Sequence, residues 1–555
     1  MTNYEKLAEL IFPNIKETIE DLENKYPKRD LPEGAMVTRF APSPTGFLHT
    51  GSLFTSLIAY RLAKQSNGVF YVRLEDTDQK REVEGSDKEL ITQLEKFGIV
   101  NDEGITSSGT QKGNYGPYVQ SERQHIYHVV IKHMIKHGLA YPCFCTTEDL
   151  DEQRKIQEAQ KIRPGYYGEF AICRNITPEE AINRIENKEQ FVIRFKSNGK
   201  HENYIKVHDE IKGTLELSEN DLDIIIMKSD GLPTYHFAHL VDDHFMHTTH
   251  VTRGEEWLPS LPIHMELFQS MNWELPKYAH LPVIMKLEDG NRRKLSKRKD
   301  AEAAVSYFLE LGYPIDGILE YLLTIANSDF EEWRLENPTL DKYEFKLTFN
   351  KMALDGALFD LDKVRNICKE YLSKLTKEEI SRQVSEWAKI HDQELLDLIN
   401  RDYNYFMEIM NIEREKDKPR KDFEKYSDVK DSITFFYEDY FDEVLKQPLP
   451  FDEKIDKEVI VEVLKGYKEH HNTECSDEEW FANLKGLATK YGFAAVMKEY
   501  KKNPENFKGN IAHFSGIIRV SVTGRNRTPN LYDILKILTP KVVKSRIDKV
   551  IAILQ

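Results

Sequence analysis

The sequence predicts an α/β fold, in which helices cover both faces of a parallel sheet and a mainly helical C-terminal part follows. Strand and helix patterns alternate from residue 36 to about 140, which is typical of parallel sheets. Helical patterns predominate after about residue 300. The chain has 555 residues, so it is too long for one core and should hold three or more domains. Its residues are 40% hydrophobic, which is enough to fill the cores of these domains.

The first 140 residues supply the alternating part. Residues 1–35 are predicted to form a helical extension, and nothing in the sequence indicates its role. Residues 36–40 alternate β-branched and aromatic side chains as a strand does, prolines and a glycine then turn the chain, and residues 52–65 have the apolar spacing of a helix. The same patterns predict a strand over 69–74 and a helix over 88–97.

The pattern changes at about residue 141. A charged helix is expected over 149–162, a glycine-flanked turn over 165–168 and a strand over 191–195. The parallel fold is expected to resume at 222–227 and to run to Lys297. Later helices are expected over 301–311, 315–325 and 361–372, and amphipathic charged segments follow residue 373.

Composition limits the class of protein. Five cysteines in so long a chain do not suggest a disulfide framework and suit a reducing compartment. No apolar run reaches the roughly 18 residues that a membrane helix needs. The first residues are too acidic for an organelle transit peptide and lack the apolar block of a signal peptide. We therefore expect a cytoplasmic protein that does not enter a membrane.

The net charge of −16 argues against a surface that is uniformly suited to nucleic acid, because phosphate contacts need Lys and Arg. Binding of RNA would then depend on local patches. One candidate patch lies near the C-terminus, where basic residues face few acids, and the alternative is a solvated helix surface. The residues are Arg519, Arg525, Arg527, Lys536, Lys541, Lys544, Arg546 and Lys549.

Two loops far apart in the sequence have the residues of a nucleotide site. His49 and Gly51 lie where a strand leads into a helix, whose start favours phosphate, and Gly51 has no Cβ to keep a ligand from the backbone. About 245 residues later the chain reads Lys294-Leu-Ser-Lys297-Arg298. Either loop alone is weak evidence for a nucleotide site, since a histidine before glycine is usually structural and a lysine cluster is usually a solvated loop. Together they predict an ATP site.

Six short motifs, in order and approximate spacing, resemble the bacterial-type glutamyl-tRNA synthetases, which are class I aminoacyl-tRNA synthetases. They are Arg39-Phe-Ala-Pro-Ser-Pro-Thr-Gly46, Leu48-His-Thr-Gly51, Arg73-Leu-Glu-Asp-Thr-Asp78, Pro233-Thr-Tyr-His-Phe-Ala238, Arg253-Gly-Glu-Glu-Trp-Leu258 and Lys294-Leu-Ser-Lys-Arg298. The resemblance covers roughly residues 36–370 and extends more weakly to the C-terminus.

The resemblance implies a Rossmann-like parallel-sheet catalytic domain in two halves, 36–140 and 236–300, with an inserted α/β domain for the tRNA acceptor end at 141–235. It also implies a helical stem-contact domain at 301–372 and an all-helical anticodon-binding region at 373–555. The extension at 1–35 lies outside the resemblance.

The chemistry is implied in the same way. ATP with Mg²⁺ would activate L-glutamate as glutamyl adenylate, and the glutamyl group would pass to the 3′ terminal ribose of the glutamate tRNA, with charging of the glutamine tRNA left open. The family leans monomeric. The implied catalytic residues are His49, Gly51, Lys294 and Lys297. The implied ATP-binding residues are Ser43, Thr45, His49, Gly51, Ser52 and Lys297. The implied glutamate-binding residues are Arg39, Ala41, Ser43, Glu75, Tyr235, His239, Arg253 and Trp257.

Arg39 is the first choice for the glutamate side chain, because a planar, always protonated guanidinium binds a carboxylate with two hydrogen bonds and so distinguishes glutamate from glutamine. By the resemblance, Glu75 would hold the ammonium, Tyr235 and Arg253 would help to fix the carboxylates, and Trp257 would wall the pocket. The structural alternatives are that both arginines are internal salt-bridge partners and that the tryptophan belongs to the core.

Two groups of residues have the composition of metal sites. Cys143, Cys145, Tyr166 and Cys173 resemble a zinc knuckle of some family members, although the tight Cys-x-Cys spacing favours ordinary reduced cysteines. A second group could by residue type hold the metal of a phosphohydrolase, but the resemblance places its segment beside the amino-acid pocket. That group is His236, His239, Asp242, Asp243, His244, His247 and His250.

Three other rivals are less favoured. A catalytically silent tRNA-binding relative would be expected to have one broken nucleotide loop, and both loops are intact. A glutaminyl-tRNA synthetase usually reads Pro-Pro-Glu-Pro-Asn-Gly where this chain reads Ala41-Pro-Ser-Pro-Thr-Gly46. A short tRNA-modifying relative lacks the long C-terminal region.

Overall fold

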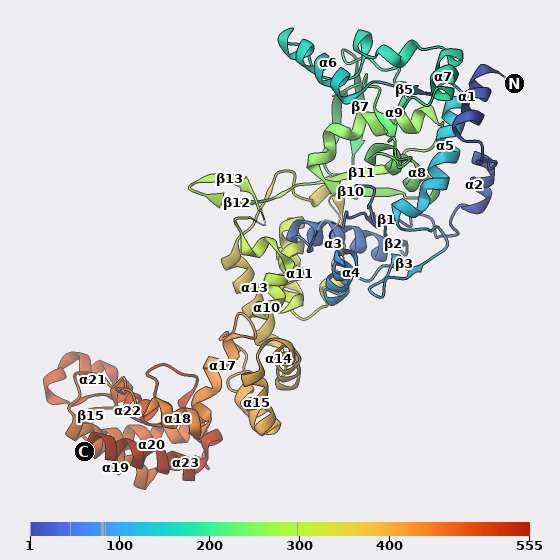
Figure 1. The fold of residues 1–555 in the computed structure, drawn as a ribbon. Helices are drawn as coiled ribbons and strands as arrows, with labels where there is room; N and C mark the ends of the chain where they lie inside the picture. The colour runs from blue at the N-terminus through green and yellow to red at the C-terminus, as the bar shows by residue number, and fades with distance from the viewer. Residues whose placement is uncertain (1, 45, 79–82, 84, 297) are drawn as a thin grey trace. The chain divides into compact units, whose positions relative to one another are not determined.

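The structure is a computed structural model that describes residues 2–44, 46–78, 83, 85–296 and 298–555. It divides into two compact units (Figure 1). Unit 1 comprises Met1–Phe308 with Leu319–Asp360, and unit 2 comprises Leu309–Ile318 with Leu361–Gln555. Among the described residues, no helix is both long and apolar enough to span a bilayer.

Parallel strands form the base of unit 1, as predicted. Their bounds are β1 Val37–Phe40, β2 Val69–Val72, β3 Glu103–Ile105, β10 His250–Gly254 and β11 Lys277–Leu281. β1, β2 and β3 pair in that order, and β10 pairs with β11. The Val37 N–H donates to Thr249 Oγ1 at 2.8 Å and the Thr249 N–H donates to Val37 O at 3.0 Å. β10 therefore begins beside β1, which brings the two halves of the parallel fold together.

Helices connect and cover these strands. α3 begins two residues before the predicted start because the His49 side chain caps the helix. α4 follows Gly85, whose φ of +77° suits glycine. Outside residues 140–227, which are described below, the other helices that lie wholly in unit 1 are α1 Asn3–Ile11, α2 Ile19–Lys25, α5 Gln124–Lys136, α8 Tyr235–Phe245, α9 Leu261–Ser270 and α12 Phe330–Glu336. The two predicted connecting helices are α3 Thr50–Gln65 and α4 Ser86–Lys96.

Antiparallel pairing replaces the parallel order in the region that the sequence marks as different. The predicted strand is β6 (Val192–Phe195), which pairs with β5 (Ala140–Cys143) on one side and β9 (Ile225–Met227) on the other. The expectation that the parallel fold resumes at 222–227 is therefore wrong: β9 belongs to this antiparallel sheet. A short apolar run looks the same in either kind of sheet, so its sequence cannot decide the partner. The remaining elements here are α6 Thr147–Ala159, α7 Pro178–Glu186, β7 Tyr204–Asp209 and β8 Gly213–Ser218.

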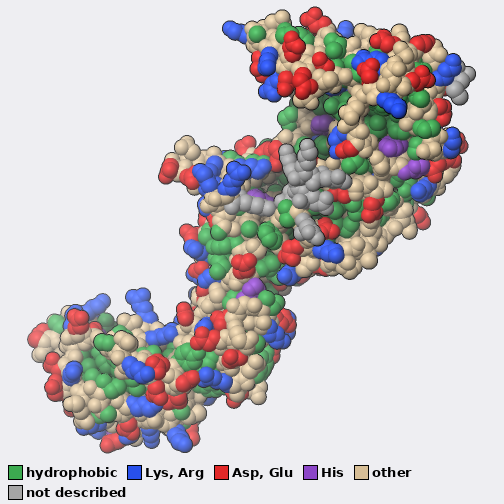
Figure 2. All heavy atoms as spheres, viewed as in Figure 1, with side chains coloured by type: hydrophobic (Ala, Val, Ile, Leu, Met, Phe, Trp, Pro, Cys, Tyr) green, Lys and Arg blue, Asp and Glu red, His purple; other side chains and the backbone are tan. Residues whose placement is uncertain are grey.

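A β-hairpin carries the late lysine loop. Strands β12 (Ile284–Glu288) and β13 (Asn291–Lys294) pair antiparallel, and the short β14 (Ala357–Leu358) lies parallel to β12. Figure 2 shows Lys and Arg side chains gathered over this hairpin, which Figure 1 labels. Two helices after it are cut by the boundary between the units: α10 Val305–Leu311 and α11 Ile315–Ala326.

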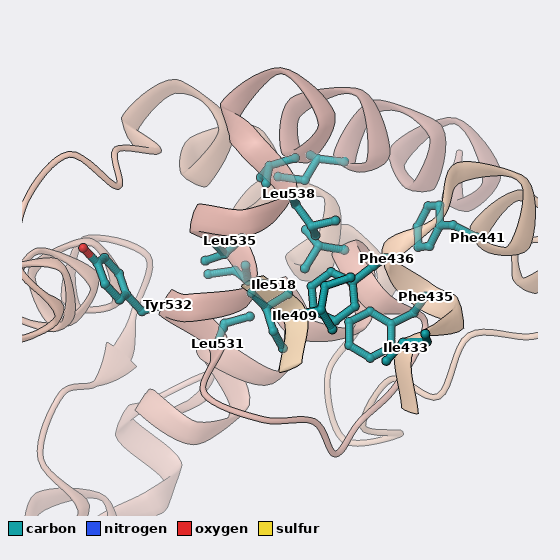
Figure 3. Close-up of a cluster of buried hydrophobic side chains, with 14 of the residues drawn as sticks. Ile409, Ile433, Phe435, Phe436, Phe441, Ile518, Leu531, Tyr532, Leu535 and Leu538 are labelled. Atoms are coloured by element: carbon teal, nitrogen blue, oxygen red, sulfur yellow. The ribbon is translucent and has the colours of Figure 1, made fainter. Parts of the chain in front are cut away.

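Unit 2 is helical, apart from the two-residue parallel pair of β15 (Phe493–Ala494) and β16 (Gly509–Asn510). Its core joins aromatic and aliphatic side chains from many of its helices (Figure 3). The helices are α13 Leu361–Lys374, α14 Lys377–His391, α15 Gln393–Arg401, α16 Tyr403–Met410, α17 Asp428–Ile433, α18 Glu438–Val444, α19 Lys457–His470, α20 Asp477–Lys490, α21 Met497–Lys502, α22 Ile511–Thr523 and α23 Leu531–Leu554. The predicted helical C-terminal part is thus confirmed.

One member of the candidate basic patch belongs to this core. The Arg546 side chain is fully buried and donates to Glu438 at 2.7 Å and to the carbonyl oxygens of Phe435 and Val522. It holds α23 against neighbouring helices and is not available to RNA. The periodicity of a helix does not tell a long basic side chain on the surface from one that is buried with a partner.

Candidate active site

The end of β1 and the start of α3 make the base of the site. His49 occupies the N-cap position in extended backbone, and its Nδ1 accepts a hydrogen bond from the Gly51 N–H at 2.9 Å. In a neutral imidazole, an accepting Nδ1 leaves the ring proton on Nε2. The helix start adds a partial positive charge. This junction can therefore bind phosphate oxygens through a side-chain donor and a favourable local potential.

The segment after the late lysine loop is hydrogen-bonded to this junction. Thr50 Oγ1 donates to Glu302 O at 2.8 Å, and the Val305 N–H donates to Leu48 O at 3.1 Å. Both bonds join residues that flank the predicted nucleotide loops. The two loops, which the sequence separates by about 245 residues, are thus neighbours in the fold.

Asp300 fixes the base of the lysine loop. Its buried carboxylate accepts hydrogen bonds from both terminal nitrogens of Arg293 at 2.6 and 2.7 Å, from Lys286 at 3.2 Å and from the Ser296 N–H at 3.0 Å. Hydrogen bonds from Arg293 hold the pKa of Asp300 well below its usual range. The hairpin is thereby tied down, while the Lys294 side chain stays 59% exposed and reaches Glu256 at 3.0 Å.

One cavity of about 520 Å³ lies among these elements. Thr45 and Lys297 lie outside the described residues, and His239 does not line the cavity. The other residues predicted for catalysis, ATP binding or glutamate binding all line it: Arg39, Ala41, Ser43, His49, Gly51, Ser52, Glu75, Tyr235, Arg253, Trp257 and Lys294. Residues predicted to bind phosphate and residues predicted to bind glutamate therefore line the same cavity.

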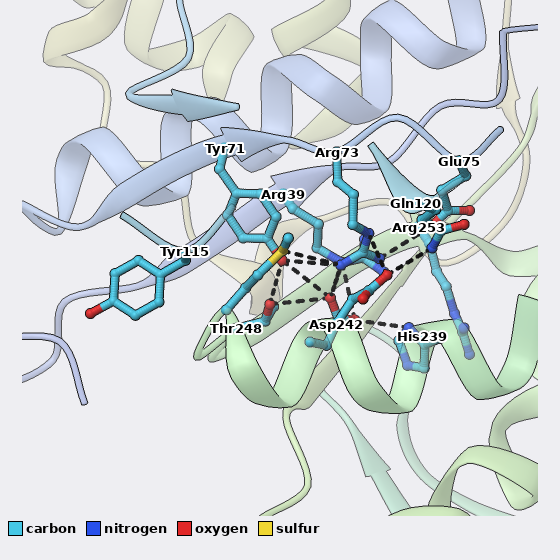
Figure 4. A network of polar contacts seen from close by, with 12 residues as sticks. Arg39, Tyr71, Arg73, Glu75, Tyr115, Gln120, His239, Asp242, Thr248 and Arg253 are labelled. Carbon is cyan, nitrogen blue, oxygen red and sulfur yellow. Dashed lines mark hydrogen bonds and ion pairs between the residues drawn. The ribbon is translucent and has the colours of Figure 1, made fainter. Parts of the chain in front are cut away.

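A buried network of charges holds the floor of this cavity (Figure 4). Arg39 Nε lies 3.3 Å from both carboxylate oxygens of Asp243, and Arg73 donates to the same carboxylate at 2.7 Å. Next along α8, Asp242 accepts from Arg123 at 2.6 Å. Burial opposes ionisation of Asp243, but Arg39 and Arg73 outweigh it and hold its pKa well below the usual range. Arg39 is both a salt-bridge partner and part of the cavity wall.

Arg253 has a different environment. It donates from Nε to His280 at 2.9 Å and lies 3.2 Å from His264 and 3.4 Å from the Tyr235 hydroxyl. Burial lowers the pKa of His280 and holds the pKa of His264 well below its usual range, so both rings are neutral near pH 7. Within the described part of the chain, Arg253 contacts neutral groups and no carboxylate, so its charge can be matched by an anionic ligand.

Glu75 faces the cavity from the other side. Its carboxylate accepts from Arg73 at 3.1 Å, and its backbone N–H donates to Pro42 O at 2.9 Å. Burial raises the pKa of Glu75 above its usual value, and the positive charges of Arg73 and Arg39 oppose this shift. An ammonium group placed here would stabilise the ionised form.

Aromatic rings and a histidine stack along one wall. Trp257 is 39% exposed, and its ring centroid lies 4.4 Å from that of Tyr235, so it walls the cavity and is not core. His239 lies behind Tyr235, with Nδ1 2.8 Å from Asp243 and Nε2 2.8 Å from the Tyr278 hydroxyl. Burial lowers the pKa of His239 to about 4. In this arrangement His239 supports the wall, and its direct contact with glutamate stays a prediction.

The acids of α8 were weighed in the sequence as metal ligands, and their role in the structure is different. Asp242 and Asp243 bind arginines instead. Among the described residues, no group of three histidine, cysteine or carboxylate ligands gathers at α8. The sequence feature that could have indicated their role is Arg73 in the motif Arg73-Leu-Glu75, because a buried arginine needs an acid to neutralise it.

Cysteines gather in the region between β5 and β6. The Sγ atoms of Cys143, Cys145 and Cys173 all lie within 4.8 Å of one another, and the last two are 3.7 Å apart. The Tyr166 hydroxyl lies 3.4 Å from Cys143 Sγ and 3.3 Å from Cys145 Sγ. Hydrogen bonds from the neighbouring thiols lower the pKa of Cys143. The sequence-predicted set is thus brought together in space.

A second cavity, of about 200 Å³, lies within unit 2. Arginines and phenylalanines line it together, and Asp422 is the acid of its wall. Burial lowers the pKa values of Arg414 and Arg525. The arginines and rings of the lining are Arg414, Arg420, Arg525, Arg527, Phe423, Phe435 and Phe436.

Comparisons with known proteins identify the family. Residues 35–345 match the sequence model of the family described as tRNA synthetases class I (E and Q), catalytic domain. A relative named glutamate–tRNA ligase from Clostridium perfringens (strain SM101 / Type A) is 48% identical over 99% of this chain and 100% of its own length. One of the same name from Acetivibrio thermocellus is 45% identical, with the same coverage of both chains.

The fold is also that of a solved structure. The glutamate tRNA ligase from Elizabethkingia meningosepticum, crystallised in complex with its amino acid, has a TM-score of 0.73 and 28% sequence identity and covers 94% of this chain and 100% of its own. The family match spans more than half of the chain, and the relatives span nearly all of it. The chain therefore belongs to the glutamate and glutamine branch of the class I tRNA synthetases.

Proposed function

We propose that this chain is a glutamate–tRNA ligase, which activates L-glutamate with ATP and transfers the glutamyl group to the 3′ terminal ribose of the glutamate tRNA. The observation that carries the proposal is the single cavity in which Lys294 and the capped start of α3 face arginines suited to two carboxylates. The full-length similarity to relatives named glutamate–tRNA ligase supports it.

In the first step, the α-carboxylate of glutamate attacks the α-phosphorus of ATP, and pyrophosphate leaves. The transition state is crowded with negative charge, so positioning and electrostatic stabilisation supply most of the catalysis. His49 and the start of α3 would bind phosphate oxygens, and Lys294 would follow the charge onto the pyrophosphate, with Lys297 in the same role. In the second step, a ribose hydroxyl of the tRNA attacks the carbonyl carbon and AMP leaves.

Mg²⁺ fits this site as the partner of the ATP phosphates. Magnesium in nucleotide enzymes is commonly held by substrate phosphates and one or two carboxylates, and does not need a protein cage. The cavity offers Glu256 beside Lys294, and among the described residues it has no group of three metal ligands. When bound, the ion would neutralise phosphate charge.

Glutamate would be held by its three charged groups. Arg39 would bind the side-chain carboxylate, Arg253 the α-carboxylate and Glu75 the ammonium. Arg253 contacts neutral groups, so a ligand carboxylate would be its only ionic partner among described residues. Charging of the glutamine tRNA, a monomeric state and a cytoplasmic location remain predictions from the sequence, and charging assays with both purified tRNAs decide the first.

The proposed function is tested by Lys294→Ala. We expect the substitution to slow glutamate-dependent ATP–pyrophosphate exchange, measured with tRNA present, by about 10²-fold, because a cation on the leaving pyrophosphate is lost. The exposed Lys446, which pairs with Glu443 in unit 2, provides the control Lys446→Ala with an unchanged rate. A wild-type protein that neither exchanges pyrophosphate nor charges tRNA with glutamate would refute the function itself.

The role of Glu75 predicts a pH dependence. Its raised pKa means that the carboxylate becomes protonated while the pH is still above the usual value for glutamate. The KM for glutamate should therefore rise as the pH falls through this pKa, since a protonated Glu75 cannot pair with an ammonium. Steady-state charging kinetics, measured from neutral pH downward for as long as the enzyme stays folded, test this. In Glu75→Gln, we expect a KM that is high at every pH; a variant that keeps the slope would contradict the assignment.

We also propose that the cysteine cluster holds a structural Zn²⁺ through Cys143, Cys145 and Cys173, with Tyr166 as the fourth group. Zinc binds thiolates at about 2.3 Å in a tetrahedron, which sets the sulfurs about 3.8 Å apart. The distance of 3.7 Å between Cys145 and Cys173 agrees with this. The ion would join the end of β5 to the turn before α7.

Metal analysis tests the zinc proposal independently of activity. Protein produced with zinc in the medium should contain about one Zn²⁺ per chain by atomic absorption, and Cys145→Ser and Cys173→Ser should lose it. The half-buried Cys475 of unit 2 gives the control Cys475→Ser, which should retain the metal. Zinc-free wild-type protein would show that the cysteines are simply reduced thiols.

For the tRNA, we propose that the arginine-lined cavity of unit 2 receives an unstacked nucleotide of the anticodon region. Unpaired RNA bases are commonly bound by aromatic rings and guanidinium planes, with basic side chains on the phosphates. The lining of this cavity combines both kinds of group. Its arginines also form a local basic site on a chain whose net charge is −16, as the sequence required of an RNA-binding surface.

Arg527→Ala tests this contact, because Arg527 is exposed and its loss should not disturb the core. The KM for tRNA should rise about 5–20-fold, and the salt dependence of tRNA binding should weaken by about one phosphate contact, while the KM values for ATP and glutamate stay unchanged. Arg382→Ala, which removes an exposed arginine paired with Glu386, is the matched control. Equal tRNA kinetics in the two variants would place the contact elsewhere.

A further inference from the structure

The N-terminal segment Thr18–Arg29 grips the end of the helix that carries the floor of the cavity. Glu23 lies 2.7 Å from His244 Nε2, on the last turn of α8. His247 Nε2 donates to Tyr26 O at 2.8 Å, and Arg29 Nε donates to Met246 O at 3.0 Å. Figure 1 shows α2, which carries Glu23, at the outer side of α5 and α8.

A second set of contacts holds the start of β3 and the stretch between β4 (Gln111–Lys112) and α5. Arg29 forms two hydrogen bonds with Glu103, at 2.8 and 2.9 Å, and its guanidinium lies 3.8 Å from the centroid of the Tyr115 ring. Tyr26 donates its hydroxyl proton to Gly116 O, and Tyr115 donates to Pro27 O, both at 2.9 Å. The segment is thus bonded both to the end of α8 and to the stretch that precedes α5.

These contacts lead to the amino-acid pocket in two ways. Directly, α8 carries Asp243, which binds Arg39, and Tyr235, which lines the cavity. Indirectly, the carbonyl oxygens of Tyr115 and Pro117 accept from Arg123, at 3.3 and 2.8 Å, and Arg123 binds Asp242 at 2.6 Å. A shift of the gripped stretches would therefore move the carboxylate that orients Arg39.

The grip is a packed interface and not a loose tether. Tyr26 is 1% exposed and Leu22 is fully buried. The side chains of Arg29 and Glu103 are 7% and 15% exposed. Buried ion pairs of this kind are sensitive to removal of one partner, because the other charge is left without compensation. The family model matches from residue 35 onward, so the segment Thr18–Arg29 lies before the matched part of the chain.

We propose that the segment Thr18–Arg29 is a positioning element for glutamate binding: by fixing the end of α8 and residues 115–118, it holds Arg39 in the geometry that receives the substrate carboxylate. Arg29 is its central positioning residue, since it contacts both Met246 and Glu103. The inference rests on the proposed function only for the identity of the ligand.

Arg29→Ala and the milder Arg29→Lys test the proposal by kinetics of the full-length enzyme. We expect the KM for glutamate to rise about tenfold in Arg29→Ala, which corresponds to roughly 1.4 kcal/mol of binding. Arg29→Lys should lie between it and wild type, because a lysine keeps one charge contact but not the fork. The KM for ATP and kcat should change less than about twofold, since the nucleotide loops are not gripped.

A matched control separates the grip from mere attachment of the extension. Lys136 on α5 binds Glu9 of α1 at 3.1 Å, so Lys136→Ala loosens the extension without touching α8. It should leave the KM for glutamate unchanged. Circular dichroism and thermal unfolding verify that each variant is folded. If Arg29→Ala does not fold, the kinetics of Arg29→Lys test the proposal.

Two results would overturn the proposal. One is an unchanged KM for glutamate in a folded Arg29 variant; the other is a parallel rise of the KM values for glutamate and ATP, which would indicate general loosening. Neither touches the proposed function, because that fails only if the wild-type enzyme does not charge tRNA with glutamate.

Discussion

The pocket depends on buried ion pairs between three arginines and the adjacent acids of α8. Arg39 comes from β1, Arg73 follows β2 and Arg123 precedes α5, so Asp242 and Asp243 join the parallel strands to two helices at one point. Unpaired, any of these charges would be costly to bury. Paired, they fix side-chain directions on a rigid support, which a binding site needs if a guanidinium is to meet a carboxylate with two aligned hydrogen bonds.

The side of the cavity proposed to bind ATP is organised differently. There the His49 side chain caps α3, and hydrogen bonds from the Thr50 hydroxyl and the Val305 N–H fasten the segment after the lysine loop beside it. Asp300 immobilises the base of the hairpin, while Lys294 at its end stays exposed. A fixed base with an exposed cation suits a group that must follow charge as it moves from one phosphate to the next.

How far the sequence predicts this molecule depends on the range of the interactions. The strand at β1 and the helix at α3 follow from local periodicity, and His49, Gly51 and Lys294 from loops whose residue types suit phosphate. By contrast, the pairing of β9, the burial of Arg546 and the arginine partners of Asp242 and Asp243 are set by contacts between segments far apart in the chain. The same applies to the N-terminal segment, whose composition gives no sign of the grip on α8.

In the proposed binding mode, the charges of the pocket would favour glutamate over glutamine. Arg39 shares the Asp243 carboxylate with Arg73. Arg253 contacts neutral groups and no carboxylate among the described residues, so a ligand carboxylate can balance its charge. Burial lowers the pKa values of His236 and His239 to about 4, which keeps both neutral near pH 7. Free glutamate carries a net charge of −1, whereas glutamine carries none. Glutamate would bring two carboxylates to Arg39 and Arg253, which are each 5% exposed, whereas glutamine would bring one and would leave one of these arginines without a ligand counter-charge.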